Sequence, residues 1–120
     1  MINNDVAPLQ RLVNATRNSF KGLRGAWASE AVLRYEIYCM AVALPAAWLL
    51  GHGAVERALL IGSALLIVIV EILNTAIEVT VDRVGFEHHE LSGRAKDLGS
   101  AAVFCAIVLA GSVWTIVLLG

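Results

Sequence analysis

Three long apolar runs constrain this chain more than any other feature of its sequence. They cover about residues 31–50, 54–84 and 98–119, and the second contains ALLIGSALLIVIV at 58–70 without a charged residue. About 20 predominantly apolar residues suffice to cross a bilayer as a helix. Because 58% of the 120 residues are hydrophobic, the chain is also too apolar for an ordinary soluble domain of its size. We predict an all-α membrane protein with three transmembrane helices in a single domain, residues 1–120.

The basic residues predict the orientation of these helices. All but one lie before or at the start of the first run, or at the end of the second run and between it and the third: Arg11, Arg17, Lys21, Arg24, Arg34, Arg83, Arg94 and Lys96. Only Arg57 lies in the remaining loop. The positive-inside rule then predicts a cytoplasmic N-terminus and a periplasmic C-terminus. The net charge of -1 argues against a nucleic-acid partner.

Residues 6–28 have the pattern of an amphipathic helix. Apolar residues recur at helical spacing beside a basic set, Arg17, Lys21 and Arg24; they are Val6, Leu9, Val13, Phe20, Leu23 and Trp27. We expect this segment to lie along the cytoplasmic membrane surface, where it would meet anionic lipid. A plain anchor helix fits the periodicity equally well.

The second apolar run carries a row of acidic and amide side chains at its end. Steps of three, four and four residues place Glu71, Asn74, Glu78 and Asp82 on one helix face about 80° wide. The run exceeds the length needed to cross a bilayer, so its end would project into the cytoplasm. Carboxylates at that depth suit Mg²⁺-assisted chemistry on a phosphate donor. Helix packing through polar contacts and a proton relay stay open as alternatives.

Three motifs resemble the bacterial integral-membrane diacylglycerol kinase family. They are ExxNxxxExxxD at 71–82, HELSGRAKDLGSAAV at 89–103 and SFKGLRGAWASEAVLR at 19–34. The resemblance implies ATP-dependent phosphorylation of the hydroxyl of 1,2-diacylglycerol to phosphatidic acid, at the cytoplasmic face of the bacterial inner membrane. It also implies Mg²⁺ as cofactor and a homotrimer with shared active sites. The residues alone argue only for oligomerisation, since three spans are few to enclose such a site.

The same resemblance assigns roles to individual residues. Glu71 would be the catalytic base, and Glu30 and Glu78 would be the metal ligands, although Arg34 stands four residues after Glu30 and would also suit it as an ion-pair partner. The implied ATP-binding residues are Arg11, Ser19, Glu30, Glu78, Glu87, His88, His89, Lys96 and Asp97. The implied lipid-binding residues are Arg11, Ser19, Arg24, Trp27, Arg34, Glu36, Arg57, Glu71, Asn74, Ser100 and Trp114.

Two alternatives compete with this reading. One is a kinase for undecaprenol or another lipid alcohol, and the other is a non-enzymatic proton-relay or assembly subunit. GLRGAW at 22–27 and HELSGRAKD at 89–97 resemble the diacylglycerol branch more closely. A relay would leave His89, Lys96 and Asp97 without a task. The small residues from Gly99 to Ala102 predict close approach to a neighbouring helix.

Overall fold

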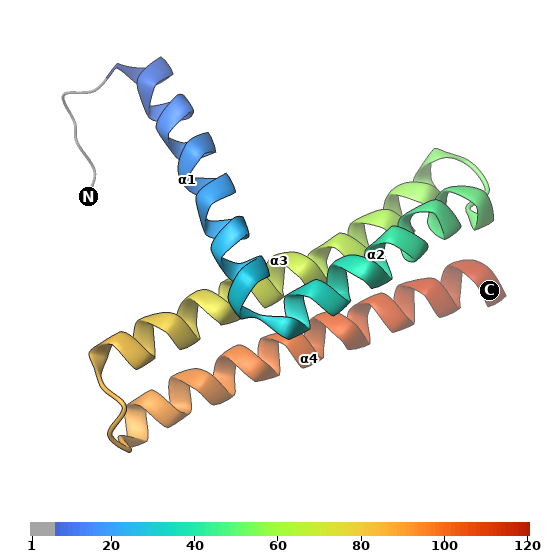
Figure 1. Ribbon diagram of the computed structural model, residues 1–120. Coiled ribbons are helices and arrows are strands. Elements are labelled where there is room, and N and C mark those ends of the chain that lie inside the picture. The colour runs from blue at the N-terminus through green and yellow to red at the C-terminus, as the bar shows by residue number, and fades with distance from the viewer. Residues whose placement is uncertain (1–6) are drawn as a thin grey trace.

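The computed structural model describes residues 7–120 as four α-helices joined by short connections. α1 spans Pro8–Ser29, α2 spans Ala31–Leu50, α3 spans Ala54–Val84 and α4 spans Glu90–Leu119. In Figure 1, α2, α3 and α4 run lengthwise beside one another, and α1 leaves them at a steep angle. The all-helical prediction is confirmed, and α2, α3 and α4 are each long and apolar enough to cross a membrane. Val6, which we predicted to begin the first helix, lies outside the described residues.

A single residue, Glu30, separates α1 from α2 and turns the chain. Its backbone is extended, with φ -114° and ψ 104°, and its N–H donates to the carbonyl of Ala26 at 2.8 Å. Arg34 donates from Nη1 to the carbonyl oxygens of Trp27, at 2.6 Å, and Ala28, at 3.4 Å. These carbonyls end α1 and have no partner within the helix, so Arg34 stabilises both the helix end and the angle between α1 and α2.

The turn between α2 and α3 is tight and fastened by one cation. Gly53 precedes α3 with φ 90°, a left-handed conformation that favours glycine. Arg57 donates from Nε to the carbonyl of Trp48 at 3.0 Å, and its guanidinium group lies 4.5 Å from the centre of the Trp48 ring. A hydrogen bond and a cation–π contact therefore tie the start of α3 to the end of α2.

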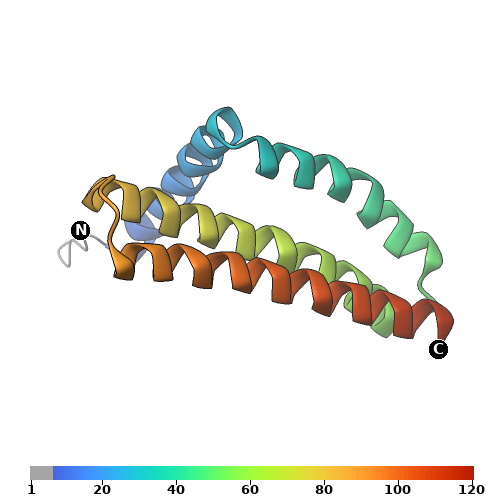
Figure 2. The same cartoon turned by 90° about the horizontal axis from the view of Figure 1, so that it is seen from below.

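α3 and α4 lie side by side in both ribbon views (Figures 1 and 2). The buried residues of the two helices are mostly small, as in closely packed membrane helices; they include Leu60, Ser63, Ala64, Gly99, Ala106 and Ala110. At one end, Trp114 donates from Nε1 to the carbonyl of Leu60 at 3.1 Å. Near the other end, Lys96 Nζ lies 2.7 Å from Asp82 Oδ1. The pair of helices is thus joined at both ends.

α4 begins eight residues before the apolar run at Leu98. His89 caps it, because its Nδ1 accepts a hydrogen bond from the N–H of Leu91 at 3.1 Å. The polar motif of residues 90–97 therefore forms the first two turns of this helix rather than a loop. Its side chains project from a rigid element.

Few side chains of this chain are buried by the chain itself. Large apolar side chains are exposed on all four helices, among them Phe20, Trp48, Leu73 and Phe104. Figure 2 shows that α2 stands apart from α3 and α4 near its start and approaches them toward its end. Such surfaces need lipid or other protein around them, since water would not solvate them favourably.

Candidate active site

The acidic stripe, Glu71, Asn74, Glu78 and Asp82, follows one face of α3. Glu71 is 9% exposed and Asn74 is 7% exposed, whereas Glu78 and Asp82 are half-buried. Among residues 7–120, no cation forms an ion pair with Glu71. The stripe therefore passes from a buried, unpaired carboxylate to a paired one in the more open part of the helix.

Asn74 contacts both another residue of the stripe and the neighbouring helix α4. Its Nδ2 donates to Glu78 Oε1 at 3.3 Å, and its Oδ1 is buried without a partner in the described part of the chain. The Oδ1 atom lies against Gly99, where an added Cβ would overlap it. Asn74 thus orients Glu78 in this structure, and helix α4 approaches it closely.

Two further carboxylates reach this region from outside α3. Glu71 lies within electrostatic range of Glu30, at the α1–α2 junction, as well as of Glu78. Glu36 of α2 lies within range of Glu71 and has one buried carboxylate oxygen, Oε2, without a hydrogen-bond partner among the described residues. Three acidic side chains, from α2, α3 and the α1–α2 junction, therefore lie within electrostatic range of Glu71.

Mg²⁺ fits this donor set. The described residues contain no group of three or more His, Cys, Asp and Glu side chains arranged to hold a metal ion. Mg²⁺ does not need one, because it is commonly held by one or two carboxylates together with substrate phosphates and water. Glu30 and Glu78, which both lie within electrostatic range of Glu71, would supply two hard oxygen ligands in a region of excess negative charge.

A pocket of about 190 Å³ lies at the turn between α3 and α4; we call it the turn pocket. Four of its lining residues were predicted to bind ATP: Glu87, His88, His89 and Lys96. Asp97 was predicted with them but is exposed and does not line the pocket. Asp82 lines the pocket beside its ion-pair partner Lys96. Two carboxylates, an ammonium group and two imidazoles thus surround one small pocket.

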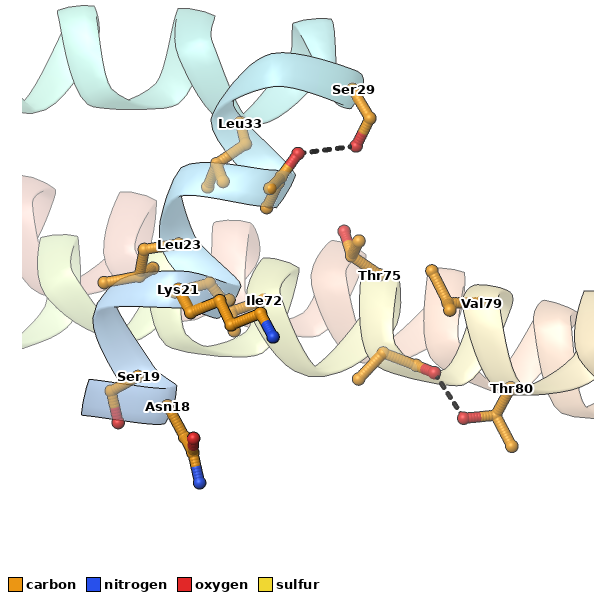
Figure 3. Close-up of a pocket in the computed structure, with 14 residues that line it drawn as sticks. Asn18, Ser19, Lys21, Leu23, Ser29, Leu33, Ile72, Thr75, Val79 and Thr80 are labelled. Atoms are coloured by element: carbon orange, nitrogen blue, oxygen red, sulfur yellow. Dashed lines mark hydrogen bonds between the residues drawn. The ribbon is translucent and has the colours of Figure 1, made fainter. Parts of the chain in front are cut away.

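A larger groove of about 1080 Å³ lies between α1 and α3; we call it the α1–α3 groove. Figure 3 shows Ser19 and Lys21 of α1 on one side and Thr75 and Val79 of α3 on the other. Ile72 of α3 also lines the groove. Ser19 is a predicted site residue, and the others are additional. Because Ile72, Thr75 and Val79 lie beside the acidic stripe on α3, this mainly apolar groove adjoins the stripe.

The remaining predicted residues are spread over the molecule. Arg24 and Ser100 are exposed and line neither the α1–α3 groove nor the turn pocket, and Arg11 lies on exposed α1. Arg34 bonds to the end of α1, and the ring of Trp27 packs edge-on against Tyr38, with centroids 5.7 Å apart.

Arg57 and Trp114 do not join the stripe in this chain. Arg57 lies 14 residues before Glu71 on the same helix, which is about 21 Å along the axis. Trp114 bonds to Leu60, about 16 Å along the axis from Glu71. Their assignment to substrate stays a prediction, and in the structure both have clear packing roles.

Two residues escaped the sequence reasoning. Asp82 was predicted as the end of the stripe but not as the partner of Lys96. Its position one turn after Glu78 was the only clue in the sequence to a role in the site. Gly99 was read only as a small packing residue, although it lies directly against Asn74. The spacing of residues along one helix reveals a stripe but not what a second helix presses against it.

Comparison with known proteins addresses the identity of this site. The family model for prokaryotic diacylglycerol kinase matches residues 17–118. The chain is 50% identical over 115 residues to a diacylglycerol kinase of Escherichia coli, covering 96% of this chain and 94% of that protein. It is 47% identical over 112 residues to that of Pseudomonas aeruginosa, covering 93% and 91%. It is 45% identical over 106 residues to that of Haemophilus influenzae, covering 88% and 90%.

The matched residues include all three motifs, at 19–34, 71–82 and 89–103, so the resemblance inferred from sequence is confirmed. They also decide between the classes of protein that the acidic stripe left open, because a relay or assembly subunit is not expected to share half its residues with kinases. The chain is an enzyme, and it belongs to the prokaryotic diacylglycerol kinase family.

Proposed function

We propose that the chain transfers the terminal phosphoryl group of ATP to the hydroxyl of 1,2-diacylglycerol and so produces phosphatidic acid. The carrying observation is the acidic stripe, which runs from buried Glu71 beside the apolar α1–α3 groove to Asp82 in the polar turn pocket. A lipid alcohol and a water-soluble nucleotide can meet only where an apolar and a polar compartment adjoin. α3 provides that boundary on one face.

The proposed roles follow from the position of each group. Glu71 takes the proton of the lipid hydroxyl while the hydroxyl oxygen bonds to the terminal phosphorus of ATP and ADP leaves. Glu71 has this role because it is the unpaired carboxylate closest to the apolar part of α3. Glu30 and Glu78 hold Mg²⁺, which supplies charge neutralisation for the nucleotide phosphates. Asn74 holds Glu78 through the 3.3 Å hydrogen bond. Lys96 exchanges its partner Asp82 for a phosphate oxygen when ATP enters the turn pocket.

We further propose that α1 lies along the cytoplasmic surface of the bacterial inner membrane. Its apolar side chains, including Leu9, Phe20 and Trp27, are exposed, and Lys21 lies at the rim of the groove beside them. A surface helix with this composition would guide lipid toward the α1–α3 groove. The excess of Lys and Arg before α2 and between α3 and α4 supports the cytoplasmic placement of both.

The orientation is testable by cysteine labelling. In a variant with Cys39 and Cys105 replaced by alanine, a cysteine at His52 should react with an impermeant thiol reagent in intact cells. A cysteine at Glu90 should react only after the cells are permeabilised. The opposite pattern would reverse the topology.

A homotrimer with shared active sites completes the proposal. Its support is the large exposed apolar surface and the small number of side chains that one chain buries. Subunits carrying Glu30→Gln, mixed with subunits carrying Glu71→Gln, should then form some complete sites and regain activity. Mixed oligomers that are verified but remain inactive would contradict shared sites.

Transfer of label from [γ-³²P]ATP tests the reaction itself. The purified protein in lipid nanodiscs is given diacylglycerol, monoacylglycerol, ceramide or undecaprenol, with Glu71→Gln as the inactive control. Label should appear in phosphatidic acid, require Mg²⁺, and be weaker or absent with undecaprenol. Preferential labelling of undecaprenol, or no transfer to any alcohol, would refute the proposed substrate.

A further inference from the structure

Gly99 is buried in α4 directly against the acidic stripe. A Cβ atom built on this glycine would overlap Asn74 Oδ1, and it would lie 3.3 Å from Asn74 Cγ and 3.7 Å from Ile77 Cδ1. The amide oxygen of Asn74 therefore occupies the space that a side chain at position 99 would need.

The chemistry of its neighbour fixes which way the Asn74 amide faces. A carboxylate only accepts hydrogen bonds, so the Nδ2 group must point toward Glu78 Oε1, at 3.3 Å. The oxygen then necessarily points the other way, toward α4. Because Asn74 is only 7% exposed, its amide is closely surrounded and has little room to adopt another position.

We propose that Gly99 is a positioning residue for the metal-binding carboxylate. By having no side chain, it leaves the space in which Asn74 turns its Nδ2 group toward Glu78, and so it sets the direction of the Glu78 oxygens. This inference rests on the proposed role of Glu78 as a Mg²⁺ ligand. A methyl group at position 99 would push Oδ1 away and break the bond between Asn74 and Glu78.

The backbone of α4 does not itself require glycine at this position. In the described residues the only glycine with positive φ is Gly53, so Gly99 has ordinary helical geometry, and alanine is the better helix former. A Gly99→Ala variant should therefore keep its helix and lose the orientation of Glu78. If Gly99 had a purely structural role, Gly99→Ala would instead disturb the helix and leave the orientation of Glu78 unchanged.

Two other glycines allow matched control variants, in which Gly→Ala adds a methyl group that contacts no other side chain. A Cβ added at Gly111 of α4 or at Gly62 of α3 would meet nothing within 4 Å. Gly111→Ala and Gly62→Ala thus add one methyl group to the same two helices. Neither residue has a role in the proposed site.

The experiment measures the response to the metal separately from turnover. With saturating ATP and diacylglycerol, Gly99→Ala should raise the Mg²⁺ concentration for half-maximal activity, or lower the maximal rate, by about 10- to 100-fold, as for other groups that orient metal ligands. The two controls should stay within about twofold of wild type. Binding of Mn²⁺ with a non-hydrolysable ATP analogue, followed by electron paramagnetic resonance, should show the same order without any turnover.

A double variant identifies the atom through which Gly99 acts. In an Asn74→Ala background there is no amide oxygen to displace, so adding Gly99→Ala should not weaken Mn²⁺ binding further. An equal loss in both backgrounds, or a Gly99→Ala enzyme that behaves like Gly111→Ala, overturns the inference while leaving the proposed function intact. A wild-type protein that phosphorylates no diacylglycerol refutes the proposed function instead, and the Mn²⁺ comparison still decides the role of Gly99.

Discussion

Replacing Glu71 by glutamine should change activity and stability in opposite directions. Glutamine keeps the shape of the side chain and its hydrogen-bonding capacity but cannot accept the hydroxyl proton. Loss of a general base costs about 10²- to 10⁴-fold in rate, which corresponds to about 3 to 5 kcal/mol of barrier. The nucleotide should still bind, since Glu71 lies on the apolar side of the stripe and does not line the turn pocket.

The stability change follows from the charges around Glu71. Glu78 is seven residues away on the same helix, about 10 Å along the axis. Two unit charges at that separation repel each other by about 0.4 kcal/mol in water and about 1.6 kcal/mol at an effective dielectric constant of 20. Because Glu78 is half-buried, we expect an intermediate value, and removing the charge of Glu71 should stabilise the metal-free protein by up to about 1 kcal/mol.

The assay needs both measurements on one preparation. Turnover is followed by label transfer from ATP, and stability by thermal unfolding in detergent with EDTA present. Glu71→Asp should retain some rate, because it keeps a base but shortens its reach. If Glu71→Gln turns over within about threefold of wild type, or if it unfolds so readily that the loss of folded protein explains the loss of activity, then Glu71 is a packing residue and the base lies elsewhere on the stripe.

Three further predictions follow from the site and the helix contacts. Glu30→Gln and Glu78→Gln should each leave the protein folded but raise its Mg²⁺ requirement about 10-fold or more, measured by titrating Mg²⁺ in the label-transfer assay; an unchanged requirement would remove the residue from the metal site. Trp114→Phe loses its hydrogen bond to a carbonyl of α3 and should cost about 0.6 to 1.7 kcal/mol in detergent unfolding, with unchanged activity per folded molecule; a raised KM for lipid alone would instead place this tryptophan at the substrate. Asp82→Asn should release Lys96 and lower the KM for ATP about two- to fivefold, whereas Lys96→Met should raise it; a raised KM in Asp82→Asn would mean that the carboxylate itself binds the nucleotide.

The sequence predicted the helices and the acidic stripe because both depend on spacing along a single element. Glu71, Asn74 and Glu78 share a face for any helix of 3.6 residues per turn, whatever surrounds it. The resemblance then added Glu30, from a different part of the chain, and the structure places that residue within electrostatic range of Glu71. Periodicity thus supplied the stripe, and the family likeness supplied Glu30, an acidic residue from a second segment.

The sequence predicted that small residues from Gly99 onward approach a neighbouring helix, but it did not predict which residues of two helices meet. In sequence, Asp97 stands next to Lys96 and is its obvious companion, yet adjacent residues on a helix point in directions 100° apart. The structure pairs Lys96 with Asp82 on the neighbouring helix instead. Which residues of α3 and α4 meet is set by the length of the turn and the rotation of each helix, and neither is encoded in a local pattern. The same applies to Gly99 and Asn74.

The length of α3 would allow so small a chain to bind the two proposed substrates, which differ in solubility. Its 31 residues extend about 46 Å, whereas the hydrocarbon core of a bilayer is about 30 Å thick. Glu71 stands 17 residues into the helix, about 26 Å from its first residue, and Asp82 stands about 42 Å from it. If α3 enters the hydrocarbon near its first residue, Glu71 lies just inside the opposite boundary and Asp82 lies in water beyond it. With that placement, a single helix face would cross the boundary between the proposed lipid alcohol and the proposed ATP. No mobile loop is needed to bring the two proposed substrates together, because the helix fixes the spacing between the carboxylates that would contact them.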